Sequence, residues 1–279
     1  MTQKKNLIIV RGAGDISTGT IHRLWSAGYR VLALETVQPA AIRRQVALSE
    51  AVYQGQAEVE GATAVRIESP EQAEAVWEAD RIPLLVDPEG DFIGKMHPDV
   101  LVDAILAKRN LGTKKSMAPL TIGLGPGFVA GEDVHYVIET MRGHNLGRII
   151  STGAAVPNTG VPGMIGGYAK ERVIHANAEG ELHVICDIGT QVIAGDQIAE
   201  IRETSGTAVA VCTKISGIVR GMIRDGYPVT KGFKIADVDP RIEELNNCYT
   251  ISDKARCIAG SVLELVCREG DRKVQSFRK

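Results

Sequence analysis

The sequence predicts an α/β fold in which a Rossmann-like parallel-sheet domain is followed by a mostly-β domain of the barrel-sandwich kind. Three observations support this prediction. Short apolar runs alternate with glycine turns in the first sixty residues, a strand motif is duplicated in the second half, and 30 of the 279 residues are glycine, against 2 Trp, 6 Tyr and 4 Phe. The length exceeds that of one typical domain. We place the domains at 1–150 and 151–279.

The N-terminal segment has the pattern of a nucleotide-binding βαβ unit. A buried-strand run at Leu7–Val10 is followed by a turn at Gly12–Gly14, a helical pattern and a second strand at Arg30–Leu34, which ends at Glu35. In dinucleotide-binding units the glycines let phosphate approach the backbone, the helix N-terminus supplies amides, and the acid holds a ribose hydroxyl. The same order is therefore expected here.

Six residues of this segment are candidate ligand-binding positions. The pattern departs from GxGxxG because a serine stands where the third glycine is expected and the glycine comes later, at Gly19. A serine hydroxyl could bond phosphate in its place. The candidates are Gly12, Gly14, Asp15, Ser17, Thr18 and Glu35. The alternative is a glycine turn that only joins a strand to a helix.

Two further helices are expected. Residues Pro39–Val52 form the first, opened by Pro39, whose missing N–H is not needed there. Arg43 and Arg44 on it could reach an acidic ligand or lie on a solvated surface. A run at Ala259–Val266 predicts a helix near the end of the chain.

Four basic residues are second-rank candidates for the anionic or reactive end of a ligand. Lys108 follows a predicted strand, and Arg142, His144 and Arg148 precede a loop rich in glycine and proline. Arginines can clamp carboxylate or phosphate, and histidine titrates near neutral pH. The alternatives are a basic surface loop for Lys108 and a hinge for the others.

The second half contains an internal repeat. Residues Gly189–Ile201 and Gly226–Val238 both read G-x-x-V-x-x-G-x-x-I-A-[DE]-[IV]. This motif resembles the flattened barrel of biotinyl and lipoyl carrier domains. The hairpin at 202–207 holds no lysine. We therefore exclude covalent biotin or lipoate and expect the barrel to form an interface.

Composition excludes several classes of function. The net charge of −2 argues against a nucleic-acid surface, and the longest apolar runs are far too short to span a membrane. The five cysteines form no CxxC pair. Reduced thiols in a cytoplasmic protein follow, and we predict no metal site. The sequence leaves a homo-oligomer open.

Several motifs together resemble one family. They are Arg11–Gly19, Gln38–Arg44, Asp103–Lys108, Gly123–Gly127, Arg142–Arg148, Asn158–Gly160 and Asp239–Arg241. They are similar to the YqeB-type accessory proteins of selenium-dependent molybdenum hydroxylase systems. The resemblance implies maturation of a xanthine dehydrogenase-like hydroxylase, a hydroxylase subunit as partner, and the molybdenum cofactor or a nucleotide-like phosphate ligand at the N-terminal turn.

Two alternative functions remain at this stage. In an NAD-dependent oxidoreductase, Glu35 would select NAD by repelling the 2′-phosphate of NADP. In a non-catalytic scaffold, the barrel domain would dock a hydroxylase subunit while the glycine turn stays empty. The family resemblance transfers no catalytic residue, so whether the protein is an enzyme stays open.

Overall fold

The computed structural model describes residues 6–160 and 163–270 and divides the chain into two compact units. The first unit contains residues up to Pro39, Ala47–Thr159 and the C-terminal segment from Ile251. The second contains Ala40–Val46 and Gly160–Thr250. This division differs from a single boundary at residue 150, because the last helix returns to the first unit.

A nine-stranded mixed sheet forms the centre of the first unit. Its strands, in spatial order, are β10 (Ile149–Ile150), β9 (Tyr136–Ile138), β7 (Leu120–Leu124), β6 (Val100–Asp103), β1 (Leu7–Arg11), β2 (Arg30–Glu35), β5 (Ile82–Val86), β4 (Ala62–Ile67) and β3 (Gln56–Val59). Neighbours from β9 to β4 pair in parallel, whereas both edge strands are antiparallel. A separate antiparallel pair joins β8 (Val129–Ala130) to β11 (Gly153–Ala154).

A two-residue turn accounts for one antiparallel edge. Glu60 and Gly61 join β3 to β4 with φ of 48° and 84°. Positive φ at both central residues is the geometry of the tight hairpin turn that matches the twist of paired strands. The two strands must therefore run in opposite directions.

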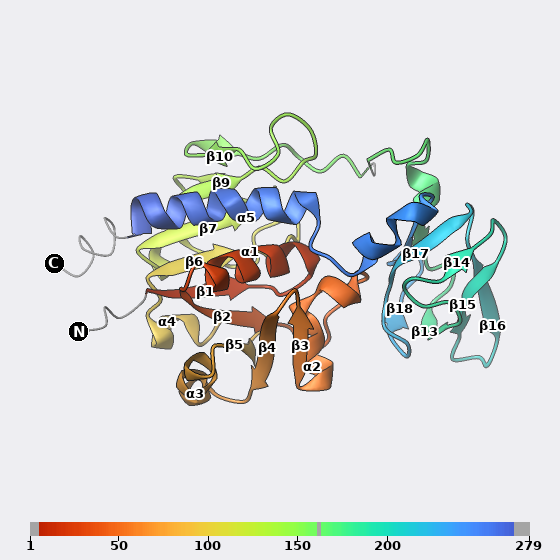
Figure 1. Ribbon diagram of the computed structural model, residues 1–279, viewed down its shortest axis with the longest axis horizontal. Helices are drawn as coiled ribbons and strands as arrows, with labels where there is room; N and C mark the ends of the chain where they lie inside the picture. The colour runs from red at the N-terminus through yellow and green to blue at the C-terminus, as the bar shows by residue number, and fades with distance from the viewer. Residues whose placement is uncertain (1–5, 161–162, 271–279) are drawn as a thin grey trace. The chain divides into compact units, whose positions relative to one another are not determined.

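Two long helices lie side by side in the first unit (Figure 1): α1 (Asp15–Ser26) and α5 (Asp253–Leu265). The shorter ones are α2 (Ala51–Gln54), α3 (Ala73–Glu78) and α4 (Ile93–Met96), with 3-10 turns at Leu48–Glu50, Pro70–Gln72 and Lys115–Met117 and a π turn at Val266–Gly270. A Cβ at Gly19 would lie 2.8 Å from the Cβ of Ala255, so α1 and α5 are in close contact. No helix within the described ranges is long and apolar enough to cross a membrane.

The second unit consists of two four-stranded antiparallel sheets. One has the order β12 (Val173–His175), β19 (Lys234–Asp239), β17 (Gly217–Met222), β14 (Gln191–Val192), and the other has β16 (Ala208–Cys212), β15 (Gln197–Arg202), β13 (Gly180–Val184), β18 (Pro228–Val229). Short 3-10 turns lie at Arg44–Val46, Lys170–Arg172 and Ile242–Cys248. The repeat supplies β14 and β15 from its first copy and β18 and β19 from its second. Each sheet thus holds the short strand of one copy and the long strand of the other.

The predicted combination of a Rossmann-like parallel-sheet domain and a biotinyl- or lipoyl-like barrel-sandwich domain is wrong. The first sheet is mixed, and several of its crossovers are short 3-10 turns or loops instead of helices. The helix expected over Pro39–Val52 is replaced by two 3-10 turns and the four-residue α2. Apolar runs locate strands, but they do not determine the direction of the partner strand or the unit to which a segment belongs.

Two glycine-to-alanine variants test the contact between α1 and α5. Alanine is favoured over glycine inside a helix by about 0.5–1 kcal/mol. Gly260, in α5, has no atom within 4 Å of the position of a Cβ, so Gly260→Ala is expected to stabilise the protein by that amount. Gly19→Ala is expected to lower the free energy of unfolding by about 1–3 kcal/mol, because the methyl group meets Ala255. Urea unfolding measures both; equal gains would contradict the close contact.

Candidate functional site

The carboxyl ends of the parallel strands in the first unit are the first place to search for a site. From β1 the chain continues to β2 on one side, while β6, β7 and β9 follow on the other side of β1. Ligands of open α/β sheets bind in the crevice outside the carboxyl ends of strands where the order reverses in this way. We call this part of the first unit the carboxyl edge. It contains the residues that directly follow β1, β6 and β9, together with the start of α1.

The glycine turn after β1 is closed by groups of the chain itself. The Gly12 N–H donates to the Leu34 carbonyl over 2.7 Å, and a Cβ on Gly12, at φ 93°, would lie 2.9 Å from the Ala104 oxygen. The Glu35 carboxylate accepts the N–H of Ala13 and of Thr36, each over 2.8 Å. Burial raises the pKa of Glu35, and these two hydrogen bonds lower it in part. An internal carboxylate therefore accepts an amide of the turn at which the sequence predicted a ligand.

The predicted hydroxyl ligands also bond within the fold. The Ser17 hydroxyl donates to the Ala104 carbonyl over 3.2 Å. The Thr18 hydroxyl donates to the Ala13 carbonyl over 3.1 Å and accepts the Leu48 N–H over 2.9 Å. Both side chains are buried, and Gly14 is the N-cap of α1. These contacts hold the turn against neighbouring loops; a ligand-binding role for these residues stays a prediction.

Arg11, Asp103 and Thr113 form a buried polar network behind this turn. Their exposed fractions are 2%, 1% and 0%. The Arg11 guanidinium donates to the Thr113 hydroxyl over 2.7 Å, and that hydroxyl donates to the Asp103 carboxylate over 2.5 Å. Arg11 also donates to the Pro88 carbonyl over 3.0 Å. Burial raises the pKa of Asp103, while Thr113, the Ile105 N–H and Arg11 lower it in part.

The loop after β6 contains strained backbone at the same edge. Leu106 and Lys108 have φ of 60° and 62°, which side-chain-bearing residues rarely adopt. Such strain persists where the surroundings enforce it, and it is common at functional sites. The Lys108 side chain is exposed.

A cluster of five charged residues lies at the carboxyl edge: Asp15, Glu139, Arg142, Asp253 and Lys254. We call it the Lys254 cluster. Burial lowers the pKa of Lys254 and the charge of Arg142 lowers it further, whereas Asp15, Glu139 and Asp253 oppose the shift. The Lys254 side chain is only half-buried, so the shift is discounted for solvent screening. Both elements that start here, α1 and α5, place their first turns in the cluster.

Hydrogen bonds fix three members of this cluster. The two Glu139 carboxylate oxygens accept the N–H groups of Met141 and Val156, over 2.7 and 2.8 Å. The Arg142 guanidinium forms a bidentate pair with Asp253, over 2.8 and 2.9 Å. Glu139 is buried, whereas Arg142 and Asp253 are largely exposed. The loop after β9 is therefore attached to the start of α5.

Of the ten predicted positions, Asp15 and Arg142 belong to the Lys254 cluster. His144 and Arg148 are exposed on the loop after β9, where the Arg148 carbonyl accepts the Glu139 N–H over 3.0 Å. Sequence reasoning missed Glu139 and Lys254. The position of Glu139 directly after a strand was a usable signal, as was Ser252-Asp253, a strong helix start. The Ser252 hydroxyl does cap α5, accepting the Ala255 N–H over 3.2 Å.

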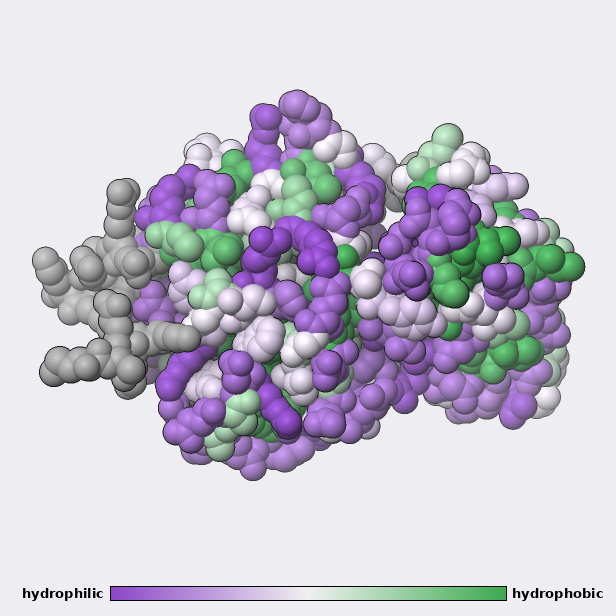
Figure 2. Space-filling view, viewed as in Figure 1, coloured by the Kyte–Doolittle hydropathy of each residue, from purple (hydrophilic) through white to green (hydrophobic). Residues whose placement is uncertain are grey.

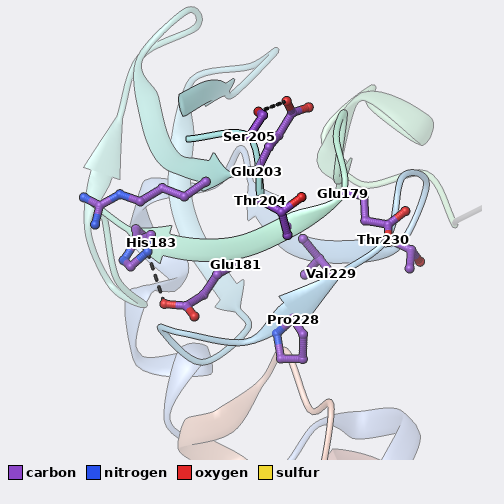
Figure 3. Close-up of a pocket in the computed structure, with 11 residues that line it drawn as sticks. Glu179, Glu181, His183, Glu203, Thr204, Ser205, Pro228, Val229 and Thr230 are labelled. Carbon is purple, nitrogen blue, oxygen red and sulfur yellow. Dashed lines mark hydrogen bonds and ion pairs between the residues drawn. The ribbon is translucent and has the colours of Figure 1, made fainter. Parts of the chain in front are cut away.

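The second unit has a hollow of its own, of about 840 Å³ (Figure 3). It is lined by Glu179, Glu181, His183, Arg202, Glu203, Thr204, Ser205, Thr230 and neighbouring residues. His183 contacts Glu181 over 3.3 Å, and the Ser205 hydroxyl donates to Glu203 over 3.2 Å. Two of the three carboxylates of the hollow are thus bonded to other residues of its lining. The negative charge of Glu179, Glu181 and Glu203 would disfavour an anionic ligand.

The second unit also exposes large apolar side chains. Its exposed large apolar residues include Ile185, Ile193, Ile242, Leu245 and Tyr249. Figure 2 shows apolar patches on the visible face of this unit, interrupted by polar surface. Within the described parts of both units, no three His, Cys, Asp or Glu side chains are placed to hold a metal ion.

Comparison with known proteins identifies one curated relative. No protein-family model matches the chain. Over 258 residues the chain is 47% identical to the uncharacterized protein YqeB of Escherichia coli strain K12. The aligned residues are 92% of this chain and 47% of the relative. The chain thus spans about half the length of the curated relative it matches.

Solved structures give weaker likenesses. An aspartoacylase family protein from Mesorhizobium loti is 12% identical, with 86% of each chain covered and a TM-score of 0.30. A succinylglutamate desuccinylase/aspartoacylase from Rhodobacter sphaeroides is 12% identical, with 85% of this chain and 86% of that chain covered and a TM-score of 0.28. The ectoine utilization protein EutE (DoeB) from Ruegeria pomeroyi is 11% identical, with 84% and 85% covered and a TM-score of 0.26. At these scores the activities of those proteins are not transferred.

The predicted role in maturing a selenium-dependent molybdenum hydroxylase is wrong, whereas a phosphate ligand at the glycine turn stays a prediction. The relative carries the name of an uncharacterized protein, and the structures that resemble this chain carry the names of aspartoacylase- and desuccinylase-type proteins. In the structure, Glu35 bonds the Ala13 amide in the turn that was expected to hold phosphate. The same findings support neither the NAD-dependent oxidoreductase nor the hydroxylase scaffold.

The pH dependence of stability tests the burial of Glu35. Because its pKa is raised in the folded state, the carboxyl contributes stability below its unfolded pKa, near 4.5, and loses it as the pH rises through the folded pKa. The free energy of unfolding of the wild type, minus that of Glu35→Gln, should therefore fall over this window in urea titrations. Glu58→Gln removes an exposed carboxyl as the control. A difference that is constant with pH would contradict the burial.

A hydroxyl deletion tests the buried network. Thr113→Val removes the bridge between Arg11 and Asp103 and leaves two buried charged groups short of a partner. We expect the free energy of unfolding to fall by about 1–3 kcal/mol. Thr113→Ser keeps the hydroxyl and should retain most of the stability. A loss in Thr113→Val no larger than that in Thr113→Ser would contradict the role assigned to the hydroxyl.

Proposed function

We propose, from the premise that this chain is a YqeB-type protein, that its first unit acts on a small molecule at the carboxyl edge and that the Lys254 amine is the reactive group. The observation that carries the proposal is the position of a half-buried lysine among charged groups from three segments: the start of α1, the loop after β9 and the start of α5. This is the end of the sheet at which α/β proteins bind ligands.

The fold holds the backbone of Lys254 in place. The residue is the second of α5, directly before Ala255, which packs on Gly19 of α1. Ser252 caps the helix two residues earlier. Reactive groups are effective when neighbouring packing fixes them, and sites on helices are more precise than sites on loops. Lys254 meets this condition, whereas the exposed Lys108 does not.

The environment of Lys254 lowers the pKa of its amine. A lysine is a nucleophile or a base only without its proton, and burial or a neighbouring cation lowers the pKa to make this form available. Both causes act on Lys254: burial first, and then Arg142. Perturbed groups of this kind cluster at functional sites, although structural ion pairs perturb pKa values as well. The strained loop after β6 at the same edge supports the functional interpretation.

Two predictions from the sequence stay open beside this proposal. The molybdenum cofactor or a dinucleotide as cofactor, and a hydroxylase subunit or a second copy of the chain as partner, have no test in the structure. The Lys254 mechanism depends on none of them.

Competitive labelling with acetic anhydride tests the proposal. Peptide mass mapping between pH 6 and 11 gives the titration midpoint of each lysine from the pH dependence of acetylation. We expect Lys254 to have a lower midpoint than exposed lysines such as Lys115. Arg142→Met should raise the midpoint by removing a cation, whereas Arg142→Lys should keep it low.

A matched control tests whether removing an arginine outside the Lys254 cluster also changes the titration midpoint of Lys254. Arg30 forms a bidentate pair with Glu74 elsewhere in the first unit, so Arg30→Met should leave the midpoint of Lys254 unchanged. If the wild-type Lys254 titrates with the exposed lysines, the proposed function is wrong.

A further inference from the structure

We propose that two copies of this chain associate through the edge strand β16 of the second unit, in a two-fold symmetric dimer that joins two of its sheets into one. This surface has no part in the proposed function, so either inference can fail without the other. Three features of β16 carry the proposal: outward-facing backbone groups, a small and uncharged sequence, and a pairing register that is the same for both copies.

The strand β16 has an edge that no strand of its own sheet covers. It is the last strand of the sheet, it pairs with β15 alone, and Figure 1 shows it at the margin of the second unit. At the hairpin between the two strands, the Glu203 N–H donates to the Thr207 carbonyl over 2.9 Å. Residues of an antiparallel ladder alternate between bonding the partner strand and facing away from it. Ala208 and Ala210 therefore direct their N–H and C=O groups away from β15.

A side-chain contact supports this direction. The Ala210 carbonyl accepts the side-chain amide of Asn177, which is not part of β15, over 2.9 Å. Within residues 6–160 and 163–270, no group accepts the outward N–H of Ala208 or of Ala210. A carbonyl oxygen has two lone pairs, so that of Ala210 can accept a second donor beside Asn177. The edge is thus open to a strand of another chain.

The other edge strands of the described sheets are protected. Natural proteins limit edge-to-edge pairing with short edge strands, charged side chains and proline. The edge strands β10, β12, β14 and β18 have two or three residues, and β18 begins with proline. The edge strand β3 has four residues and contains Glu58. In contrast, β16 has five residues, Ala-Val-Ala-Val-Cys, without charge or proline.

The symmetry of the strand favours a second copy as its partner. Two identical strands that pair antiparallel about a two-fold axis form an isologous interface, in which each copy contributes the same groups. With the axis at Ala210, Ala210 pairs with its own equivalent and Ala208 pairs with Cys212 of the other copy. All five residues of β16 are then paired, and outward-facing groups meet outward-facing groups, as the ladder requires.

The exposed face of β16 accepts this pairing without repulsion. Its side chains, those of Ala208, Ala210 and Cys212, are small and uncharged. The charged side chains beside them on β15, Glu200 and Arg202, bond to each other over 2.8 Å. A second copy therefore brings no like charges directly opposite one another, an arrangement that would destabilise the pair.

The opposite face of β16 gains apolar contact. Val211 is buried in the core of the second unit, whereas Val209 is only partly buried against it. In the register centred on Ala210, Val209 of one copy faces Val211 of the other. The dimer would thus cover the apolar surface that Val209 still exposes.

Sedimentation equilibrium of the full chain over a range of concentrations tests the proposal. We expect a monomer–dimer equilibrium with a Kd of about 10 µM, because one pair of strands is smaller than a standard protein interface. A protein that stays monomeric up to about 1 mM would overturn the dimer.

The variant Ala210→Pro tests the edge itself. Proline removes the outward N–H and leaves the ladder to β15 intact, which is the setting in which edge strands tolerate proline. We expect dimerisation to weaken by about tenfold, because the two hydrogen bonds at the axis are lost. Ala210→Ser keeps the N–H and should dimerise like the wild type. Equal dimerisation of the two variants, with urea unfolding showing that both are folded, would contradict the proposal.

A charge pair tests the position of the axis without proline. Ala210→Lys and Ala210→Glu each place like charges opposite one another, so each variant alone should dimerise about fivefold more weakly than the wild type. An equal mixture of the two should recover the dimer, because opposite charges then meet. A mixture no tighter than its components would overturn the register.

Cross-linking tests the pairing of Ala208 with Cys212. In a hydrogen-bonded antiparallel pair the two Cα atoms lie about 5.5 Å apart, within the range of a disulfide. Ala208→Cys should therefore form a covalent dimer under mild oxidation, linked through Cys212 in peptide mass maps. Adding Cys212→Ser should abolish this link. A dimer in sedimentation that never forms the link would show that another surface joins the copies.

Discussion

The contact between Gly19 and Ala255 is the constraint on which the carboxyl edge depends. A Cβ at residue 19 would lie 2.8 Å from that of Ala255, so only glycine lets α1 and α5 approach this closely. The two helices come from opposite ends of the sequence, yet this contact brings both of their first turns to the carboxyl edge. Asp15 and Lys254, each in the first turn of its helix, are thereby brought close enough for the charge of Asp15 to act on Lys254. The bidentate Arg142–Asp253 pair then attaches the loop after β9 to the same helix start.

Glu35 shows how one sequence pattern can serve two purposes. An acid at the end of the second strand is expected to hold a ligand hydroxyl in a dinucleotide site. Here its carboxylate bonds the Ala13 amide of the glycine turn and the Thr36 amide. The pattern of strand, turn, helix and acid is the same in both cases. The two cases differ in whether the carboxylate bonds the amides of the glycine turn or points toward a ligand. The spacing of the residues does not specify which of these occurs.

The sequence was informative wherever a local signal determined the structure. Strand β1, helix α1 and strand β2 follow from apolar runs and turn residues, and the duplicated motif supplies equivalent strands in both sheets of the second unit. The prediction failed for the direction of an edge strand and for the unit to which a segment belongs. The hairpin turn at Glu60-Gly61 makes one edge antiparallel, and residues 40–46 join the second unit instead of a helix in the first. Lys254 was missed because three of the four charged groups that act on it, Asp15, Glu139 and Arg142, lie more than 100 residues away in the sequence.

A single physical cause links the stability of the carboxyl edge to its proposed chemistry. Burial disfavours charge on every titratable group, so it raises the pKa of Glu35 and Asp103 and lowers that of Lys254. For the two acids, stability is lost as the pH rises above their unfolded pKa values. For the lysine the folded pKa lies below the unfolded one, so the cost of burying it is relieved only as the pH rises toward 10.5. Near neutral pH the fold therefore bears both the cost of ionising the buried acids and the cost of burying the lysine. If water entered the carboxyl edge freely, burial would shift these groups less, and the pKa of the Lys254 amine would lie closer to that of an exposed lysine.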